Sequence, residues 1–92
     1  MIKNKYPREN TSRVRHMVRG HILITTAPGE MRDIRERIES LSNIKSVEMV
    51  TGPYDLIAQA EAEDLSTLTS TVLDNIRHIT GVLDTTTCVV IE

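Results

Sequence analysis

The stretch VTGPYDLIAQA, residues 50–60, concentrates the side chains best suited to binding chemistry. A Gly-Pro pair separates two apolar runs, and Tyr54 and Asp55 follow it directly, although the chain holds two aromatic residues in all. Backbone N–H groups around a glycine turn can receive an anion, a carboxylate accepts strong hydrogen bonds from cations, and a tyrosine offers an apolar wall with a polar tip. Gly52, Tyr54 and Asp55 are therefore candidate ligand-binding residues.

Each of the three also has a structural interpretation. The glycine and proline form a hairpin turn in either case, Asp55 can bond nearby backbone N–H groups, and Tyr54 is a residue type favoured at subunit interfaces. The sequence leaves both interpretations open.

Other chemistries find little support in the sequence. The histidines, Cys88 and the methionines are scattered, without the spacing of a zinc or copper site, so we expect no metal and no cofactor. A metal site assembled across subunits stays open. The four glycines lie far apart, which argues against a phosphate-binding loop. No spacing in the sequence indicates a nucleophile paired with a general base. We expect the protein not to be an enzyme, and Cys88 to be a buried apolar residue.

Composition and charge indicate one small intracellular domain with a basic leader. Ninety-two residues suffice for a single core, a lone cysteine fits a reducing cytoplasm, and no apolar run is long enough to span a membrane. Residues 1–20 hold six basic residues and one acid, whereas residues 21–92 hold five basic and twelve acidic residues. We expect residues 1–17 to be a basic arm, partly disordered or an edge strand, and residues 18–92 to be the domain.

The order of elements follows from hydrophobic periodicity. Short apolar and β-branched segments predict strands near 21–27, 45–51, 55–62 and 82–92. Two apolar stripes at helical spacing predict helices from Met31 to Leu41 and from Leu65 to Ile79. The two halves of the chain have similar sequence patterns at an offset of thirty-five residues, as in NIKSV and HITGV. This repeated strand-helix-strand unit predicts a ferredoxin-like βαββαβ fold of class α+β, with a four-stranded antiparallel sheet and both helices on one face.

The other face of that sheet has nothing in this chain to cover it. Residues 22–24 are apolar on both sides of the strand, so an uncovered sheet would forfeit several kcal/mol at roughly 25 cal/mol per Å². We therefore expect a homodimer packed sheet against sheet, a dimeric α+β barrel.

With these elements in place, the chain resembles the ligand-binding domain of the Lrp/AsnC family of transcriptional regulators, also called the RAM domain. The matching segments are HILITTAPG, VEMVTGPYDLIAQAEAED and ITGVLDTTTCVV, which span roughly residues 18–92. The strongest element is Val-Thr-Gly-x-Tyr-Asp, followed about thirty residues later by Gly-Val and Thr-x-Thr. Full-length members carry an N-terminal helix-turn-helix, for which the leading residues of this chain are too few. The resemblance therefore implies a stand-alone effector domain, and DNA binding by this chain alone is doubtful.

The resemblance also implies a function. It predicts a cytoplasmic module that binds an amino acid or a related small metabolite, forms homodimers that assemble into an octamer or decamer, and can join full-length Lrp/AsnC regulators. Carried over residue by residue, the effector site comprises Gly52, Tyr54, Asp55, Asp74, Thr85 and Thr87. Two alternatives remain: a small dimeric α+β barrel enzyme acting on a small metabolite, or a DNA-associated accessory protein that uses its basic arm.

Overall fold

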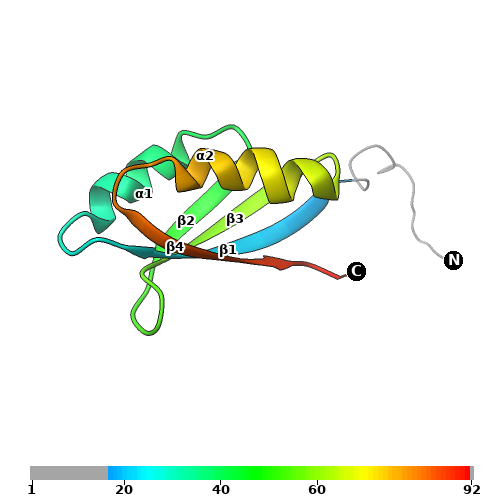
Figure 1. Cartoon of the computed structure of the whole chain (residues 1–92). Helices are drawn as coiled ribbons and strands as arrows, with labels where there is room; N and C mark the ends of the chain where they lie inside the picture. The colour runs from blue at the N-terminus through cyan, green and yellow to red at the C-terminus, as the bar shows by residue number, and fades with distance from the viewer. Residues whose placement is uncertain (1–16, 92) are drawn as a thin grey trace, which may run out of the picture.

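The computed structural model describes residues 17–91, which form a four-stranded antiparallel sheet with its helices on one face (Figure 1). The sheet order is β2-β3-β1-β4, and every neighbouring pair is antiparallel. The ferredoxin-like α+β fold is thus confirmed. Residues 1–16 of the predicted arm lie outside the described residues. The elements, in chain order, are β1 (Val18–Thr26), α1 (Met31–Glu39), β2 (Ile44–Met49), β3 (Leu56–Ala62), η2 (Thr67–Val72), α2 (Leu73–Arg77) and β4 (Val82–Val89).

Strand β1 lies at the centre of the sheet, between β3 and β4. The sequence suggested an arm or edge strand within residues 1–17 and a separate strand near 21–27, whereas the structure has one continuous strand from Val18 to Thr26. Gly20 interrupts the apolar pattern without ending the strand, because the helical layer approaches it closely. A Cβ at Gly20 would lie 3.0 Å from Cδ2 of Leu68, a side chain with no exposed surface. This glycine serves packing instead of a turn.

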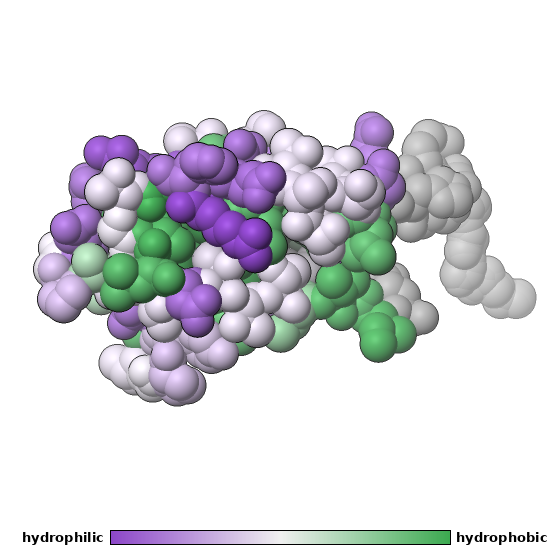
Figure 2. All heavy atoms as spheres, viewed as in Figure 1, coloured by the Kyte–Doolittle hydropathy of each residue, from purple (hydrophilic) through white to green (hydrophobic). Residues whose placement is uncertain are grey.

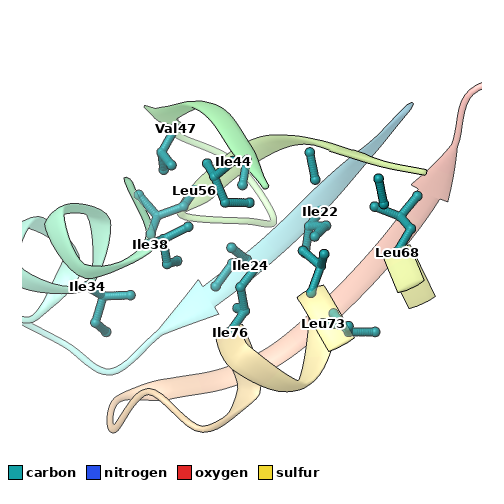
Figure 3. Packing of buried hydrophobic residues seen from close by; sticks show 14 residues of the cluster. Ile22, Ile24, Ile34, Ile38, Ile44, Val47, Leu56, Leu68, Leu73 and Ile76 are labelled. Atoms are coloured by element: carbon teal, nitrogen blue, oxygen red, sulfur yellow. The ribbon is translucent and has the colours of Figure 1, made fainter. Parts of the chain in front are cut away.

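The core fills the space between the sheet and the helices, where side chains from both layers point toward one another (Figure 3). Ala58, Ala60 and Ala62 line the inner face of β3, and their small size lets the helices approach the sheet closely. The larger fully buried side chains are Ile22, Ile24, Ile34, Ile38, Leu56, Leu68, Val72 and Ile76.

The second helical segment differs from the regular helix that the sequence predicted. Its middle, Thr67–Val72, is a π-helix, and the α-helix follows at Leu73–Arg77. The hydroxyls of Thr69 and Ser70 donate to carbonyl oxygens four residues earlier, at 2.9 and 2.6 Å. Such back-bonding competes with the regular helical pattern and favours a local irregularity. Leu65, predicted in the buried stripe, lies before the π-helix and is 51% exposed.

The outer face of the sheet, which carries no helix, is less apolar than the sequence suggested. Leu23 and Ile57 lie half-buried at its centre, but polar side chains such as Gln59 and Glu48 share the face. Cys88 also lies on this face and is exposed, so the prediction of a buried thiol is wrong for the single chain. No helix among the described residues is long and apolar enough to cross a membrane.

Apolar surface also gathers near the two ends of strand β4. Figure 2 shows two such areas, separated by polar surface. The large apolar residues with the most exposed surface are Leu65, Leu83, Val89 and Ile91.

Candidate functional site

The connection between β2 and β3 is a tight hairpin that projects from the sheet on the side away from the helices (Figure 1). The N–H of Val50 donates to the carbonyl oxygen of Asp55 at 2.9 Å and closes the loop. Gly52 has a φ of 126°, a conformation that residues with a Cβ rarely adopt. Gly52 is exposed and Tyr54 is half-buried, so the predicted turn and its tyrosine both reach the surface.

Asp55 is held by the end of strand β1. Its Oδ2 accepts hydrogen bonds from the backbone N–H of Thr26 at 2.8 Å and from the Thr26 hydroxyl at 3.3 Å. Its own N–H donates to the carbonyl oxygen of Ile24 at 2.9 Å. The structural interpretation of Asp55 thus applies, although the partner is a neighbouring strand and not its own turn. Oδ1 is the carboxylate oxygen that remains for a ligand.

Asp74 lies in the first turn of α2 with its carboxylate exposed. Its Oδ1 is 3.9 Å from Nη1 of Arg77, a weak exposed ion pair. Its backbone oxygen accepts the N–H of His78 at 3.0 Å and lies 2.7 Å from Nδ1 of the same ring. Asp74 therefore helps to order the end of the helix, and its carboxylate faces solvent beside a guanidinium.

Thr85 and Thr87 face the helical layer from strand β4. They lie opposite Ile24 and Ile22 of β1, both fully buried on the inner side of the sheet. The hydroxyl oxygen of Thr87 is buried and has no hydrogen-bond partner among the described residues. Thr87 thus points its hydroxyl into the packed layer, whereas Thr85 is among the residues that line a surface cavity.

A cavity of about 220 Å³ opens beside Thr85, where α2 ends and β4 begins. Its walls are Arg77, Val82, Leu83, Asp84 and Thr85. Asp84 Oδ1 accepts the N–H of Thr85 at 3.0 Å, which orients the Asp84 carboxylate. The residues around this hollow thus include one basic, one acidic and two apolar residues.

Sequence reasoning missed Arg77, Leu83 and Asp84 as site residues. The available signal was the helix-Gly-strand joint RHITGVLD, whose reversal at Gly81 must bring charges on either side of it together. Gly81 has a φ of 99°, which makes that reversal possible.

The predicted residues therefore form two groups in one chain. Asp55 contacts the end of β1 from the β3 side, whereas Thr85 pairs with β1 from the β4 side. Asp74 joins the β4 group through Arg77, and the cavity beside Thr85 has no hairpin residue in its walls. Within residues 17–91, no three side chains of the metal-ligand type gather.

The structure is thus a small antiparallel α+β domain with a surface cavity where α2 ends and β4 begins. The model of the family described as the Lrp/AsnC ligand binding domain matches residues 20–92. The chain therefore belongs to the Lrp/AsnC ligand-binding domain family.

Solved structures share the fold of this chain. The chain is similar to PHS023 from Pyrococcus horikoshii, with 31% identity, a TM-score of 0.74, and coverage of 82% of this chain and 90% of that one. It is also similar to TTHA0845 from Thermus thermophilus, with 29% identity, a TM-score of 0.76, and coverage of 82% and 94%. A regulator of Neisseria meningitidis, NMB0573 in complex with L-Met, shares the fold at 20% identity and a TM-score of 0.73, over 99% of this chain and 60% of that chain. No curated protein matches the chain.

Proposed function

We propose that this chain binds an amino-acid effector and that binding alters its assembly, as a module of transcriptional regulation and not as an enzyme. The observation that carries the proposal is the cavity beside Thr85, which has Arg77 and Asp84 among its lining residues in a family ligand-binding domain. The L-Met complex of the structural neighbour NMB0573 is consistent with this ligand class.

The chemistry of the cavity suits a zwitterion. Arg77 offers paired N–H donors to a carboxylate, and Asp84 offers oxygens to an ammonium group. Leu83 is 65% exposed at the cavity wall and provides apolar surface for a ligand side chain. Asp74 adds a second carboxylate through its contact with the same arginine.

The hairpin completes this site from a second copy of the chain. In one chain the hairpin and the cavity lie on opposite sides of β1, so a shared site requires association. The projecting loop carries Gly52, Tyr54 and Asp55 to the surface, where backbone N–H groups and Oδ1 of Asp55 can reach a ligand held by a neighbouring copy. A ligand that binds between copies favours the associated state, because it binds that state more tightly.

The first level of association is a homodimer through the outer face of the sheet. Leu23 and Ile57 lie half-buried at the centre of this face, and a small domain gains much from covering such surface. Dimers then join through the hairpins into an octamer or decamer. Leu23→Glu should leave a monomer in sedimentation at micromolar concentration, whereas Leu65→Glu, on the helical side, should not. A wild-type monomer under those conditions would refute the dimer.

Amino-acid binding is tested by calorimetry against the common amino acids, together with mass measurement by light scattering. Binding of at least one amino acid with a change in assembly size is expected. Arg77→Gln should weaken that binding about tenfold or more, since it removes a charge-assisted contact, whereas Arg32→Gln on α1 should not. If calorimetry detects no binding of any common amino acid, the proposed ligand class is wrong.

We further propose that residues 1–17 are a basic arm distinct from domain 18–92, and that the module works in the cytoplasm alongside full-length Lrp/AsnC regulators. The arm carries an excess of basic residues over an acidic body. Co-purification with a full-length regulator should survive deletion of residues 1–16 if the domain makes the contact. A gel shift with DNA that disappears on the same deletion would instead assign DNA contact to the arm.

A further inference from the structure

The apolar surface near the end of β4 forms a patch that the proposed effector site does not use. This end patch consists of Leu65, Val89 and Ile91, which are 51%, 38% and 95% exposed. Figure 1 places the start of β1, the start of the second helical segment and the end of β4 at one end of the molecule, and Figure 2 shows apolar surface there. Leu83, also strongly exposed, lies at the other end of β4 and belongs to the cavity beside Thr85.

The end patch joins the sheet to the helical layer. Val89 pairs with Gly20 of β1, and a Cβ at Gly20 would lie 3.0 Å from Cδ2 of Leu68. Leu68 follows Leu65 by three residues, so the two side chains are neighbours on one helical face. Because Gly20 has no side chain, Val89 of the sheet lies close to the first turn of the second helical segment.

The patch extends past the end of β4. The N–H of Val90 donates to the carbonyl oxygen of Arg19 at 2.9 Å, so the chain still runs beside β1 after Val89. Side chains alternate along an extended chain, which puts Ile91 on the same side as Val89. Apolar residues that gather in one exposed patch, unlike single scattered ones, are typical of an interaction surface.

The leading residues of the chain enter the domain next to this patch. Val18, the first residue of β1, pairs with Ala62 at the end of β3, and Arg19 bonds to Val90 beside the patch. Sixteen residues precede the described part of the chain. At about 3.3 Å per residue they can reach about 50 Å, so the segment is long enough to cover the patch.

Charge and apolar content also suit residues 1–16 to this surface. They hold five basic residues and one acid, and they include Tyr6 and Val14. The loop that leads from β3 to the first turn of the helical segment carries Glu63 and Asp64, both exposed. A basic segment with apolar side chains thus begins beside an apolar patch with acidic residues at its rim, and opposite charges of this kind favour one partner over others.

We propose that residues 1–16 of the same chain cover the end patch, so that the basic arm binds back onto the domain that follows it. Tyr6 and Val14 contact the apolar side chains, and basic residues of the arm face Glu63 and Asp64. The chain's own arm has an advantage over that of another copy, because a tethered segment acts at a high effective concentration. The contact uses neither the outer face of the sheet nor the effector cavity, so it depends on neither the dimer nor the amino acid.

A spin label on the arm tests this contact in the full chain. Cys88→Ser removes the one native thiol, and Asn10→Cys then places the label between Tyr6 and Val14 without replacing either. NMR of methyl groups measures the signal loss that the label causes, which falls steeply with distance. We expect the methyl signals of the end patch to lose most of their intensity and those of Leu83, at the far end of β4, to stay nearly unchanged.

A mixed sample shows which chain supplies the arm. Spin-labelled chains without methyl labels are mixed with methyl-labelled chains without a spin label, and the two are unfolded and refolded together. The label and the observed methyl groups then lie on different chains, so the end patch should keep its intensity. A signal loss there as large as in the first sample would assign the contact to a second copy and overturn the proposal.

Substitutions in the patch separate a specific contact from general attraction. Leu65→Ser should restore much of the lost intensity at Val89 and Ile91, whereas Leu83→Ser, at a residue of similar exposure, should restore none. Half of the Leu65 surface is already exposed, so its substitution should leave the melting temperature nearly unchanged, and a loss of contact is not a loss of fold.

Two further results would overturn the proposal. One is a signal loss that is equal at the end patch and at Leu83, which would mean that the arm has no preferred place on the domain. The other is an unchanged signal loss in Leu65→Ser, which would mean that the patch does not hold the arm. Neither result would bear on amino-acid binding, which Arg77→Gln tests, or on the dimer, which Leu23→Glu tests.

Discussion

Removal of the Asp55 carboxylate should destabilise the fold as well as any ligand site. The Thr26 N–H that it binds belongs to a residue 9% exposed, at a donor-acceptor distance of 2.8 Å. Asp55→Ala leaves this buried donor without its partner, and water reaches it poorly. A hydrogen bond to a charged group contributes about 1.5–3 kcal/mol, and the longer contact with the Thr26 hydroxyl adds less. The expected loss is about 2–3 kcal/mol.

Urea denaturation and thermal melting measure this loss. In a domain of this size each kcal/mol shifts the melting temperature by about 4–8 °C, so Asp55→Ala should melt about 10–20 °C lower. Thr26→Val removes the hydroxyl contact and keeps the backbone N–H, and it should cost under about 1 kcal/mol. This pair of variants separates the two hydrogen bonds.

Asp55→Asn distinguishes the structural role from a role in binding. Asparagine keeps a neutral oxygen for the Thr26 N–H, so the free energy of unfolding should fall by only about 1 kcal/mol. It removes the negative charge that an ammonium group would contact, so amino-acid binding should weaken much more than stability. A loss below about 0.5 kcal/mol for Asp55→Ala would refute the reasoning from the Thr26 contact.

Two further predictions concern the turns that frame the helices. Gly81→Ala should cost about 2–4 kcal/mol, since it adds left-handed strain and a Cβ 2.8 Å from Cδ1 of the buried Ile34. Gly29→Ala, at a φ of 82° with open space around it, should cost about 1–2 kcal/mol, and equal losses in urea denaturation would contradict the clash. The pKa of Asp64 is lowered from its ordinary value of 3.8, because its Oδ1 accepts the Thr67 N–H at 2.7 Å. Its carboxylate therefore stabilises the fold above pH 3.8, and this stabilisation is lost as the pH falls through the lower, folded-state pKa. Asp64→Asn caps the helix without a charge, so its difference in melting temperature from the wild type should change below pH 3.8 and stay constant between about pH 5 and 7.

The sequence predicts the fold well because apolar residues recur at regular spacings along most of its strands and helices. The antiparallel order of the four strands and the apolar stripe of α1 both lie where the pattern places them. Strand β1 begins at Val18 and not near residue 21, because Gly20 continues the strand as a point of close packing. The π-helix escaped prediction because hydroxyl back-bonding, and not apolar spacing, favours it.

The candidate site was less predictable, because a motif shows which residue types are present but not which atoms are already bonded. The hairpin motif suggested an Asp55 carboxylate facing a ligand, whereas one of its oxygens binds β1. The cavity beside Thr85 depends on a helix-strand joint that brings Arg77 near Asp84, seven residues later.

The two hydrogen bonds to Thr26 bear on how a ligand could use Asp55. Because Oδ2 is bound to the end of β1, the carboxylate keeps one position before any ligand arrives. A ligand ammonium can approach Oδ1 without breaking either bond, so binding does not compete with folding. Ordering a free side chain would cost about 0.5–1.5 kcal/mol, and a carboxylate that is already fixed avoids that cost. The structural and the binding interpretations of Asp55 are therefore compatible, and the first strengthens the second.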